Sequence, residues 1–217
     1  NDVADCEHRI RSALSVTVDD GLEFDPSSVR GEMIRDEADY TGVRVHVAVR
    51  LATARIGLHA DINFGDPVWP APAPTDLPLL LGGSIRLLSY PDHMVLAEKI
   101  VTAIERGIVN TRWRDFADID AIAQHRNIAA ADLSEAVAVV AAHRGATLSP
   151  LADALAGMAE IAQPRWIAWR RKQRLWDATP EQFQDLLDRC AALADPVLTG
   201  DAQGKTWSHE DGHWVSR

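Results

Sequence analysis

The chain of 217 residues is long enough to form one large domain or two small ones with a buried core. Its formal net charge of −10 excludes a general coating of nucleic acid, so any nucleic-acid contact must use a local basic patch. No apolar run has the length of a membrane span, and no secretory signal opens the chain. Cys6 and Cys190 lie far apart without a metal-binding spacing. These features favour a cytoplasmic protein that does not enter a membrane.

The first part of the chain is predicted to form a short helix followed by a sheet. Residues 5–14 indicate a helix that begins with Asp2 or Asp5 as its cap. Apolar and polar residues alternate over 43–51 and again over 55–66, and the short link between these segments predicts an antiparallel hairpin. The alternation in the second strand places these residues on a buried face: Ile56, Leu58, Ala60, Ile62 and Phe64.

Asp61 lies on the opposite face of that strand and has two interpretations. A carboxylate on a rigid strand beside an apolar core can be a metal ligand, but an outward-facing aspartate is more often simply solvated. Arg44, His46 and Arg50 point outward from the preceding strand. They either line a phosphate site beside Asp61 or belong to a solvated sheet face.

The rest of the chain is expected to change from extended to helical structure near Pro91. The five prolines within 67–78 indicate a stiff extended segment, and Gly82-Gly83-Ser84 indicates an ordinary turn. Asp92 is expected to cap the first helix, and the tryptophans at 207 and 214 are expected to pack onto the body. The expected helices cover approximately residues 93–106, 112–122, 132–140, 150–161 and 180–194. The predicted fold class is therefore α+β, with a sheet-bearing domain at 1–88 and a helical domain at 89–217.

One group of charged side chains comes from two consecutive helices joined by a short turn, so its members are expected to converge. It consists of Lys99, Arg112, Arg114, Asp115 and Asp118. Cations beside carboxylates are what phosphoryl transfer requires, because its catalysis is mostly positioning and charge neutralisation. The alternative is a salt-bridge cluster that only joins the two helices.

A basic, tryptophan-rich block spans residues 165–176. Arg170, Arg171 and Lys172 are candidates for contacts with RNA phosphates, and the tryptophans for stacking on bases. The alternative is an amphipathic helix whose tryptophans are buried and whose cations are solvated.

Three segments together resemble a known family. They are LHADINFGD at 58–66, the Tyr90-Pro91 pair leading to Ala97-Glu98-Lys99, and NTRWRDFAD at 110–118. In order and approximate spacing they are similar to the AbiEii/AbiGii nucleotidyltransferase toxins, which include the MenT toxins. The likeness extends from near the start of the chain to Trp214.

The resemblance implies a polymerase-β-like nucleotidyltransferase sheet followed by a helical domain. It also implies transfer of a nucleotide from an NTP, with Mg²⁺, to an RNA acceptor, which is the 3′ end of tRNA in the MenT group. The partners it implies are the NTP, tRNA and a cognate antitoxin protein of the AbiEi kind. By motif position Asp61 is the third metal-binding carboxylate, Lys99 holds the NTP phosphates, and Asp115 is the helical catalytic acid. Arg112 then assists in nucleotide binding, and Asp118 supports the cluster.

The sequence departs from the family pattern at its start. The first family motif, a Gly-Ser or Gly-Gly turn followed by Asp-x-Asp, is expected just before the helix at 5–14, where the chain begins at Asn1 without Met. Gly82-Gly83-Ser84 follows Asp61 and cannot replace that motif. Asp61 alone provides too few anionic ligands for two-metal chemistry. We expect either that the other carboxylates lie upstream of Asn1, or that the chain is a truncated, inactive member that binds an antitoxin or RNA.

Overall fold

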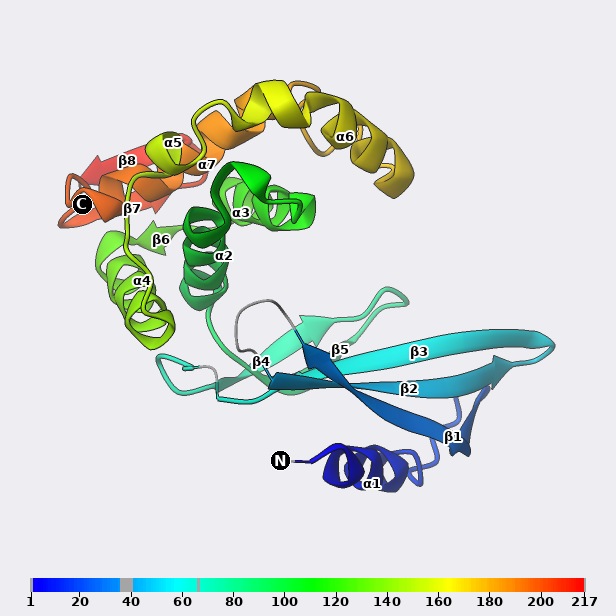
Figure 1. The fold of residues 1–217 in the computed structure, drawn as a ribbon. Helices are drawn as coiled ribbons and strands as arrows, with labels where there is room; N and C mark the ends of the chain where they lie inside the picture. The colour runs from blue at the N-terminus through cyan, green and yellow to red at the C-terminus, as the bar shows by residue number, and fades with distance from the viewer. Residues whose placement is uncertain (1, 36–40, 66, 217) are drawn as a thin grey trace. The chain divides into compact units, whose positions relative to one another are not determined.

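The computed structural model describes residues 2–35, 41–65 and 67–216. These residues form a mixed α/β structure with seven α-helices and small antiparallel sheets (Figure 1). The chain divides into two compact units, Asn1–Asp66 and Pro67–Arg217, and each is described by itself. The expected combination of helices with sheets is confirmed. The polymerase-β-like character of the sheet and the domain boundary at residue 88 stay predictions.

The first unit is a helix on a three-stranded sheet. Its elements are α1 (Val3–Ala13), β1 (Leu22–Arg35), β2 (Thr41–Leu51) and β3 (Ala54–Asn63), and the strands are antiparallel in the order β1-β2-β3. The predicted hairpin between β2 and β3 is confirmed. Asp2 caps α1, because its carboxylate accepts from the backbone N–H groups of Ala4 and Asp5.

A small core fixes α1 to the sheet. Cys6 of α1 is buried among Val29, Val43 and Val45. Glu7 accepts a hydrogen bond from the backbone N–H of Gly31 on β1 at 2.7 Å. This bond, with help from Arg11, holds the pKa of the Glu7 carboxyl below its ordinary value.

The predicted burial of one face of β3 is confirmed only towards the end of the segment, where Ile62 and Phe64 are partly buried against the small core. It is wrong at Ile56 and Leu58, which are 36% and 45% exposed. The helix α1 packs on β1 and β2, so it does not cover that part of β3. Alternation along a strand predicts which side chains share a face, but it does not say whether a second layer covers that face.

The second unit begins with the hairpin of β4 (Ala73–Pro78) and β5 (Ser84–Ser89). Its turn contains Gly82 and Gly83, both with positive φ, which confirms the predicted turn. The proline-rich segment thus ends in a strand, which the sequence did not predict. Two-stranded pairing explains this, because both strands are then edges and tolerate proline.

The remaining elements of the second unit are mostly helical. They are α2 (Asp92–Arg106), the 3₁₀-helix η1 (Gly107–Val109), α3 (Trp113–His125), β6 (Ile128–Ala129), α4 (Ala130–Arg144), α5 (Leu151–Ala154), α6 (Met158–Gln173), α7 (Phe183–Leu198), β7 (Lys205–Ser208) and β8 (His213–Ser216). Two expectations need correction. Asp92 is the first helical residue rather than the cap, and its carboxylate pairs with Arg126 at 3.1 Å. The helix expected at 150–161 is two helices, separated at Gly157, whose φ is positive.

The core of this unit centres on packed aromatic rings. Phe183 of α7 meets Trp113 and Phe116 of α3 edge to face, with ring centroids 5.4 and 5.7 Å apart. Trp166 of α6 lies 5.2 Å from the same phenylalanine and is fully buried. Three helices are therefore joined through one side chain.

The C-terminal tail packs onto this core, as predicted. The indole N–H of Trp207 donates to the carbonyl of Ala123 at 2.7 Å, and that of Trp214 donates to Leu193 at 3.1 Å. β7 pairs with both β6 and β8. This small sheet was not predicted, since β6 has only two residues and no visible period.

Both cysteines are free and buried, one in each unit. The thiol of Cys190 on α7 donates to the carbonyl of Phe116 at 3.5 Å. Burial, reinforced by the charge of Asp120, raises the pKa of the Cys190 thiol well above its ordinary value.

Replacing Phe183 by Ala is expected to lower the free energy of unfolding by about 3–5 kcal/mol, because it leaves a cavity among three aromatic rings. Urea denaturation followed by far-UV circular dichroism measures this loss. Leu148→Ala is the control, since Leu148 is 38% exposed and its truncation removes little packing. Equal losses in the two variants would contradict the central role of Phe183.

Candidate active site

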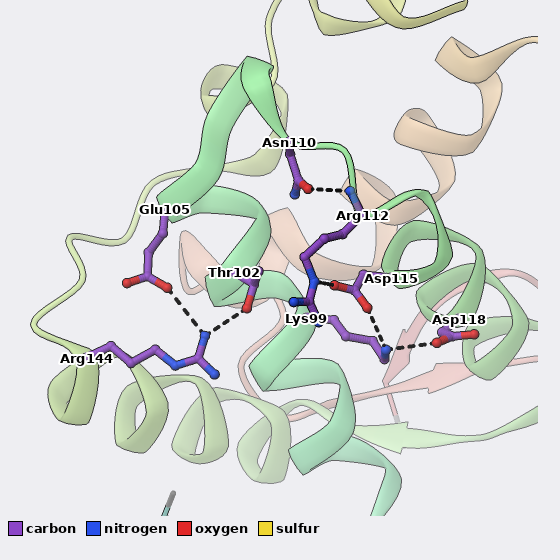
Figure 2. A network of polar contacts seen from close by, with 8 residues as sticks. All are labelled: Lys99, Thr102, Glu105, Asn110, Arg112, Asp115, Asp118 and Arg144. Carbon is purple, nitrogen blue, oxygen red and sulfur yellow. Dashed lines mark hydrogen bonds and ion pairs between the residues drawn. The ribbon is translucent and has the colours of Figure 1, made fainter. Parts of the chain in front are cut away.

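Lys99 lies between two carboxylates of the following helix (Figure 2). Its ammonium Nζ on α2 is 2.9 Å from Asp115 Oδ1 and 2.8 Å from Asp118 Oδ2, both on α3. The two acids are three residues apart and therefore share one face of α3. The expected convergence of Lys99 with these acids is present in the structure.

Arg112 joins the same group from the segment that leads into α3. Its Nε donates to Asp115 Oδ2 at 2.5 Å, so Asp115 bridges two cations. The carbonyl oxygen of the Asn110 side chain accepts from the backbone N–H of Arg112 at 2.8 Å. This bond is an Asx turn, and it orients the residue that precedes the helix. We call Lys99, Arg112, Asp115 and Asp118 the Lys99 network.

The Lys99 network extends from the interior to the surface. The side chains of Asp115 and Lys99 are 8% and 18% exposed, whereas those of Asp118 and Arg112 are 43% and 49% exposed. Two cations face two acids, so the network is close to neutral. Its exposed members can be reached by a ligand without unfolding of the helices.

The pKa of the Lys99 ammonium is raised above its ordinary value. Burial alone would lower it, but hydrogen bonds to Asp118 and Asp115 and the charges of these acids outweigh that effect. Lys99 is therefore a cation at neutral pH, which is the state that binding of phosphate requires.

A second polar contact fixes α2 against α4. Arg144 Nη1 donates to Thr102 Oγ1 at 2.8 Å and lies 3.4 Å from Glu105 Oε2 (Figure 2). Thr102 and Glu105 follow Lys99 on α2 at intervals of three residues. The helix that carries Lys99 is thus held on both sides by charged contacts.

Asp61 belongs to the first unit, and both of its oxygens accept from Arg44. The distances are 2.6 Å from Nε to Oδ1 and 2.7 Å from Nη2 to Oδ2. These hydrogen bonds hold the pKa of the Asp61 carboxyl below its ordinary value. The pairing follows from the β2–β3 register, in which Arg44 stands opposite Asp61.

The other two side chains considered for a phosphate site on that face also lie beside acids. His46 Nε2 lies 3.2 Å from Glu32, and Arg50 forms an ion pair with Glu23. Arg44, His46 and Arg50 thus each have a carboxylate as neighbour. Paired and exposed side chains correspond to the alternative of a solvated sheet face.

Within the described ranges, no group of three or more His, Cys, Asp or Glu side chains could hold a metal ion. Mg²⁺ is a hard cation that takes several oxygen ligands in octahedral geometry. The donor set around Asp61 does not fit it, because both carboxylate oxygens face a guanidinium. As they stand, these residues do not form a metal site.

The basic block divides into structural and exposed residues on α6. Trp166 is buried and stacks on Trp169 at 5.3 Å, which agrees with a core role for these two rings. Arg170 donates to the carbonyl and hydroxyl of Thr179 at 2.9–3.1 Å and so holds the loop after the helix. Arg171 and Lys172 are exposed.

The sequence did not single out Asn110 or the pairing of Arg44 with Asp61. The pairing was accessible, because a two-residue turn at Ala52-Thr53 sets Leu51 opposite Ala54 and hence Arg44 opposite Asp61. For Asn110 the available signal was an amide three residues before the first residue of α3, a position that favours an Asx turn.

The fold and the Lys99 network define a mixed α/β protein with cations and carboxylates held together by two consecutive helices. The chain belongs to the AbiEii nucleotidyltransferase toxin family of type IV toxin–antitoxin systems, whose family model matches residues 1–204. Its class is thus nucleotidyltransferase toxin, with a nucleotide substrate and an antitoxin counterpart. Neither the curated proteins nor the solved structures give a match. Among the helices described, none is both long and apolar enough to cross a membrane.

The Lys99→Met variant tests the electrostatic role of the network. Because the pKa of Lys99 is raised in the fold, its ion pairs stabilise the protein fully below about pH 10.5 and lose this effect as the pH rises through the folded-state pKa. We expect the variant to be less stable than the wild type by about 2–4 kcal/mol at pH 8, with a smaller difference above pH 10.5. Urea denaturation across this range measures both values.

Lys205→Met is the control for that experiment, because the same charge is removed from strand β7, away from the network. Its stability is expected to stay within about 0.5 kcal/mol of the wild type at pH 8. A difference between the Lys99→Met variant and the wild type that stays constant from pH 8 to pH 11.5 would contradict the role assigned to the ammonium.

Proposed function

We propose that this toxin transfers a nucleotide from an NTP to the 3′ end of tRNA, as the MenT group does. The observation that carries the proposal is the position of Lys99, a cation at neutral pH between Asp115 and Asp118 inside the region matched by the family. The partly exposed Arg112 adds a second cation at the other carboxylate oxygen of Asp115. Two cations beside acids suit the phosphates of an NTP.

In this proposal the network exchanges partners when the nucleotide binds. The Lys99 ammonium binds the triphosphate and turns from Asp118, which is the more exposed of its two acids. Asp115 stays between Lys99 and Arg112, where it keeps both cations in position. Preorganised cations of this kind stabilise charge that develops in the transition state without reorganising water.

The proposed reaction requires Mg²⁺. As paired with Arg44, Asp61 is not a metal ligand, and two-metal chemistry needs further carboxylates beside it. The described residues do not supply them, and Asp61 must first leave Arg44. We therefore propose that the reaction depends on Mg²⁺ and assign no set of protein ligands to the ion.

The proposed acceptor, tRNA, is expected to contact the exposed cations of α6. Arg171 and Lys172 offer charge to phosphates, whereas Arg170 is already engaged by the loop at Thr179. Because both substrates occur in the cytoplasm, we place the reaction there.

A second candidate function is a catalytically inactive family member that binds an antitoxin or RNA. The observation in its favour is the bidentate Arg44–Asp61 pair together with the lack of an acidic cluster among the residues described. The two candidates differ in one measurable property, the transfer of nucleotide.

Incubation with each radiolabelled NTP, Mg²⁺ and total tRNA is expected to place label on tRNA. Lys99→Met and Asp115→Asn are expected to lower the rate by about 100-fold or more, because each removes preorganised charge from the reacting phosphates. Lys205→Met, which removes a charge outside the matched region, is expected to retain the rate.

The outcomes separate the candidates. Label on polypeptide identifies a protein acceptor in place of RNA. A folded wild-type sample that labels nothing with any NTP favours the inactive binding module. The Asp61→Ala variant is measured in the same assay. Loss of labelling supports a role for the Asp61 carboxylate in the reaction, and an unchanged rate shows that this carboxylate is not part of the active site.

The double variant Arg171→Ala/Lys172→Ala is expected to weaken tRNA binding most at low salt. If both side chains contact phosphates, the slope of log K against log salt falls by about two. Filter binding between 50 and 300 mM salt measures the slope. The control is Arg86→Ala/Lys205→Ala, which removes the same charge from two strands. Equal slopes for the two double variants would remove α6 from the RNA interface.

A further inference from the structure

A hollow of about 160 Å³ lies in the second unit beside the Lys99 network. Its walls come from the segment between α2 and α3 and from the N-terminal half of α6. The side chains that the argument uses are Ile108, Val109, Asn110, Trp113, Ile161 and Arg165. A hollow of this size has room for one flat ring system.

Asn110 forms part of this wall and is only 2% exposed. Its Oδ1 is used by the backbone N–H of Arg112, which fixes the orientation of the amide. Its Nδ2 is buried and has no hydrogen-bond partner among the residues described. A buried donor without an acceptor is costly, so this amide is suited to a ligand that brings an acceptor.

Aliphatic side chains frame the hollow around this amide. Val109, Ile161 and Ile108 are 79%, 61% and 44% exposed, so three large apolar side chains face solvent at one place. The indole of Trp113 completes the wall. Apolar surfaces with one oriented polar group are what a flat heterocycle needs: contact for its faces and a donor for its edge.

The charges around the hollow indicate that the ring belongs to a polyanion. Arg165 is exposed at the wall and has no ion-pair partner within the described ranges. Lys172 follows Arg165 by seven residues and thus lies on the same face of α6. On the other side, Asn110 is hydrogen-bonded to Arg112, a member of the Lys99 network.

We propose that the hollow binds a single nucleobase, with Asn110 Nδ2 donating to an acceptor atom on the base edge. The base belongs either to the NTP, whose phosphates reach Arg112 and Lys99, or to the 3′-terminal nucleotide of an RNA that follows the cations of α6. This assignment rests on the proposed function and names the part of the site that holds the base.

The test compares ligands with and without the base. One arm measures the affinity of the full chain for each NTP and for inorganic tripolyphosphate by titration calorimetry with excess Mg²⁺. The other arm measures the affinity for tRNA with its 3′-terminal nucleoside present and after its removal. The ratio within each arm isolates the nucleoside, that is, base and ribose together, and the effect of each variant on that ratio then tests the contacts of the base.

Two variants alter the hollow. Asn110→Asp keeps the oxygen that accepts from Arg112 but loses the donor, and Ile161→Ala removes one apolar wall. Each variant is expected to reduce the ratio of the affinities with and without the nucleoside about tenfold, either for the NTP or for tRNA, whichever supplies the base. Ile167→Ala is the matched control: Ile167 is also on α6 and 45% exposed, but it is not part of the hollow. It is expected to leave both ratios unchanged.

The outcome identifies the source of the base. A reduced ratio for NTP assigns the hollow to the substrate nucleotide, and a reduced ratio for tRNA assigns it to the acceptor. Ratios unchanged by both variants, or a wild type whose affinity does not depend on the base, would overturn the inference. Labelling of tRNA by the wild type is measured in parallel. If the wild type labels tRNA but the variants leave the affinity ratios unchanged, only the assignment of the hollow to a nucleobase is overturned. If the wild type does not label tRNA, the proposed nucleotide transfer is overturned.

Discussion

The buried ammonium of Lys99 is the interaction on which the arrangement of α2 and α3 depends. A cation that is largely removed from water requires acidic partners in fixed positions, and Asp115 and Asp118 supply them from a single helical face. The ion pairs act together with the packing of Trp113 and Phe116 of α3 on Phe183. The segment before α3, which includes Asn110, lines a hollow together with the N-terminal half of α6.

The elements that the sequence predicted correctly are those in which local chemistry and packing agree. The apolar stripe of α2 contains Leu96 and Ile100, and both are fully buried. The β2–β3 hairpin follows from two alternating segments and a two-residue turn. The alternation in β3 was correct as a pattern, but as a statement of burial it was wrong at Leu58, which faces solvent, and right at Ile62, which packs on the core. Burial depends on which other element covers a face, and that information is not local.

The candidate site was predictable to a similar extent. The spacing of Asp115 and Asp118, and their distance from Lys99 across a short connection, were sufficient to group the three side chains. The hairpin register places Arg44 opposite Asp61, but no local pattern in the sequence indicates that Arg170 would hold a loop. Asn110 was missed for a related reason. Asn110 matters because its Nδ2 donor has no hydrogen-bond partner among the residues described. This can be recognised only once the positions of the surrounding residues are known.

The two cysteines have a consequence for experiments on this protein. Cys6 is buried in the core of the first unit and Cys190 in that of the second, so each thiol is shielded by different packing. Alkylating reagents attack the thiolate, which must therefore be exposed and deprotonated. The modification rate of each cysteine then reports how often its own unit opens. Mass spectrometry of the alkylated chain can therefore follow the opening of each unit separately, without any label being introduced.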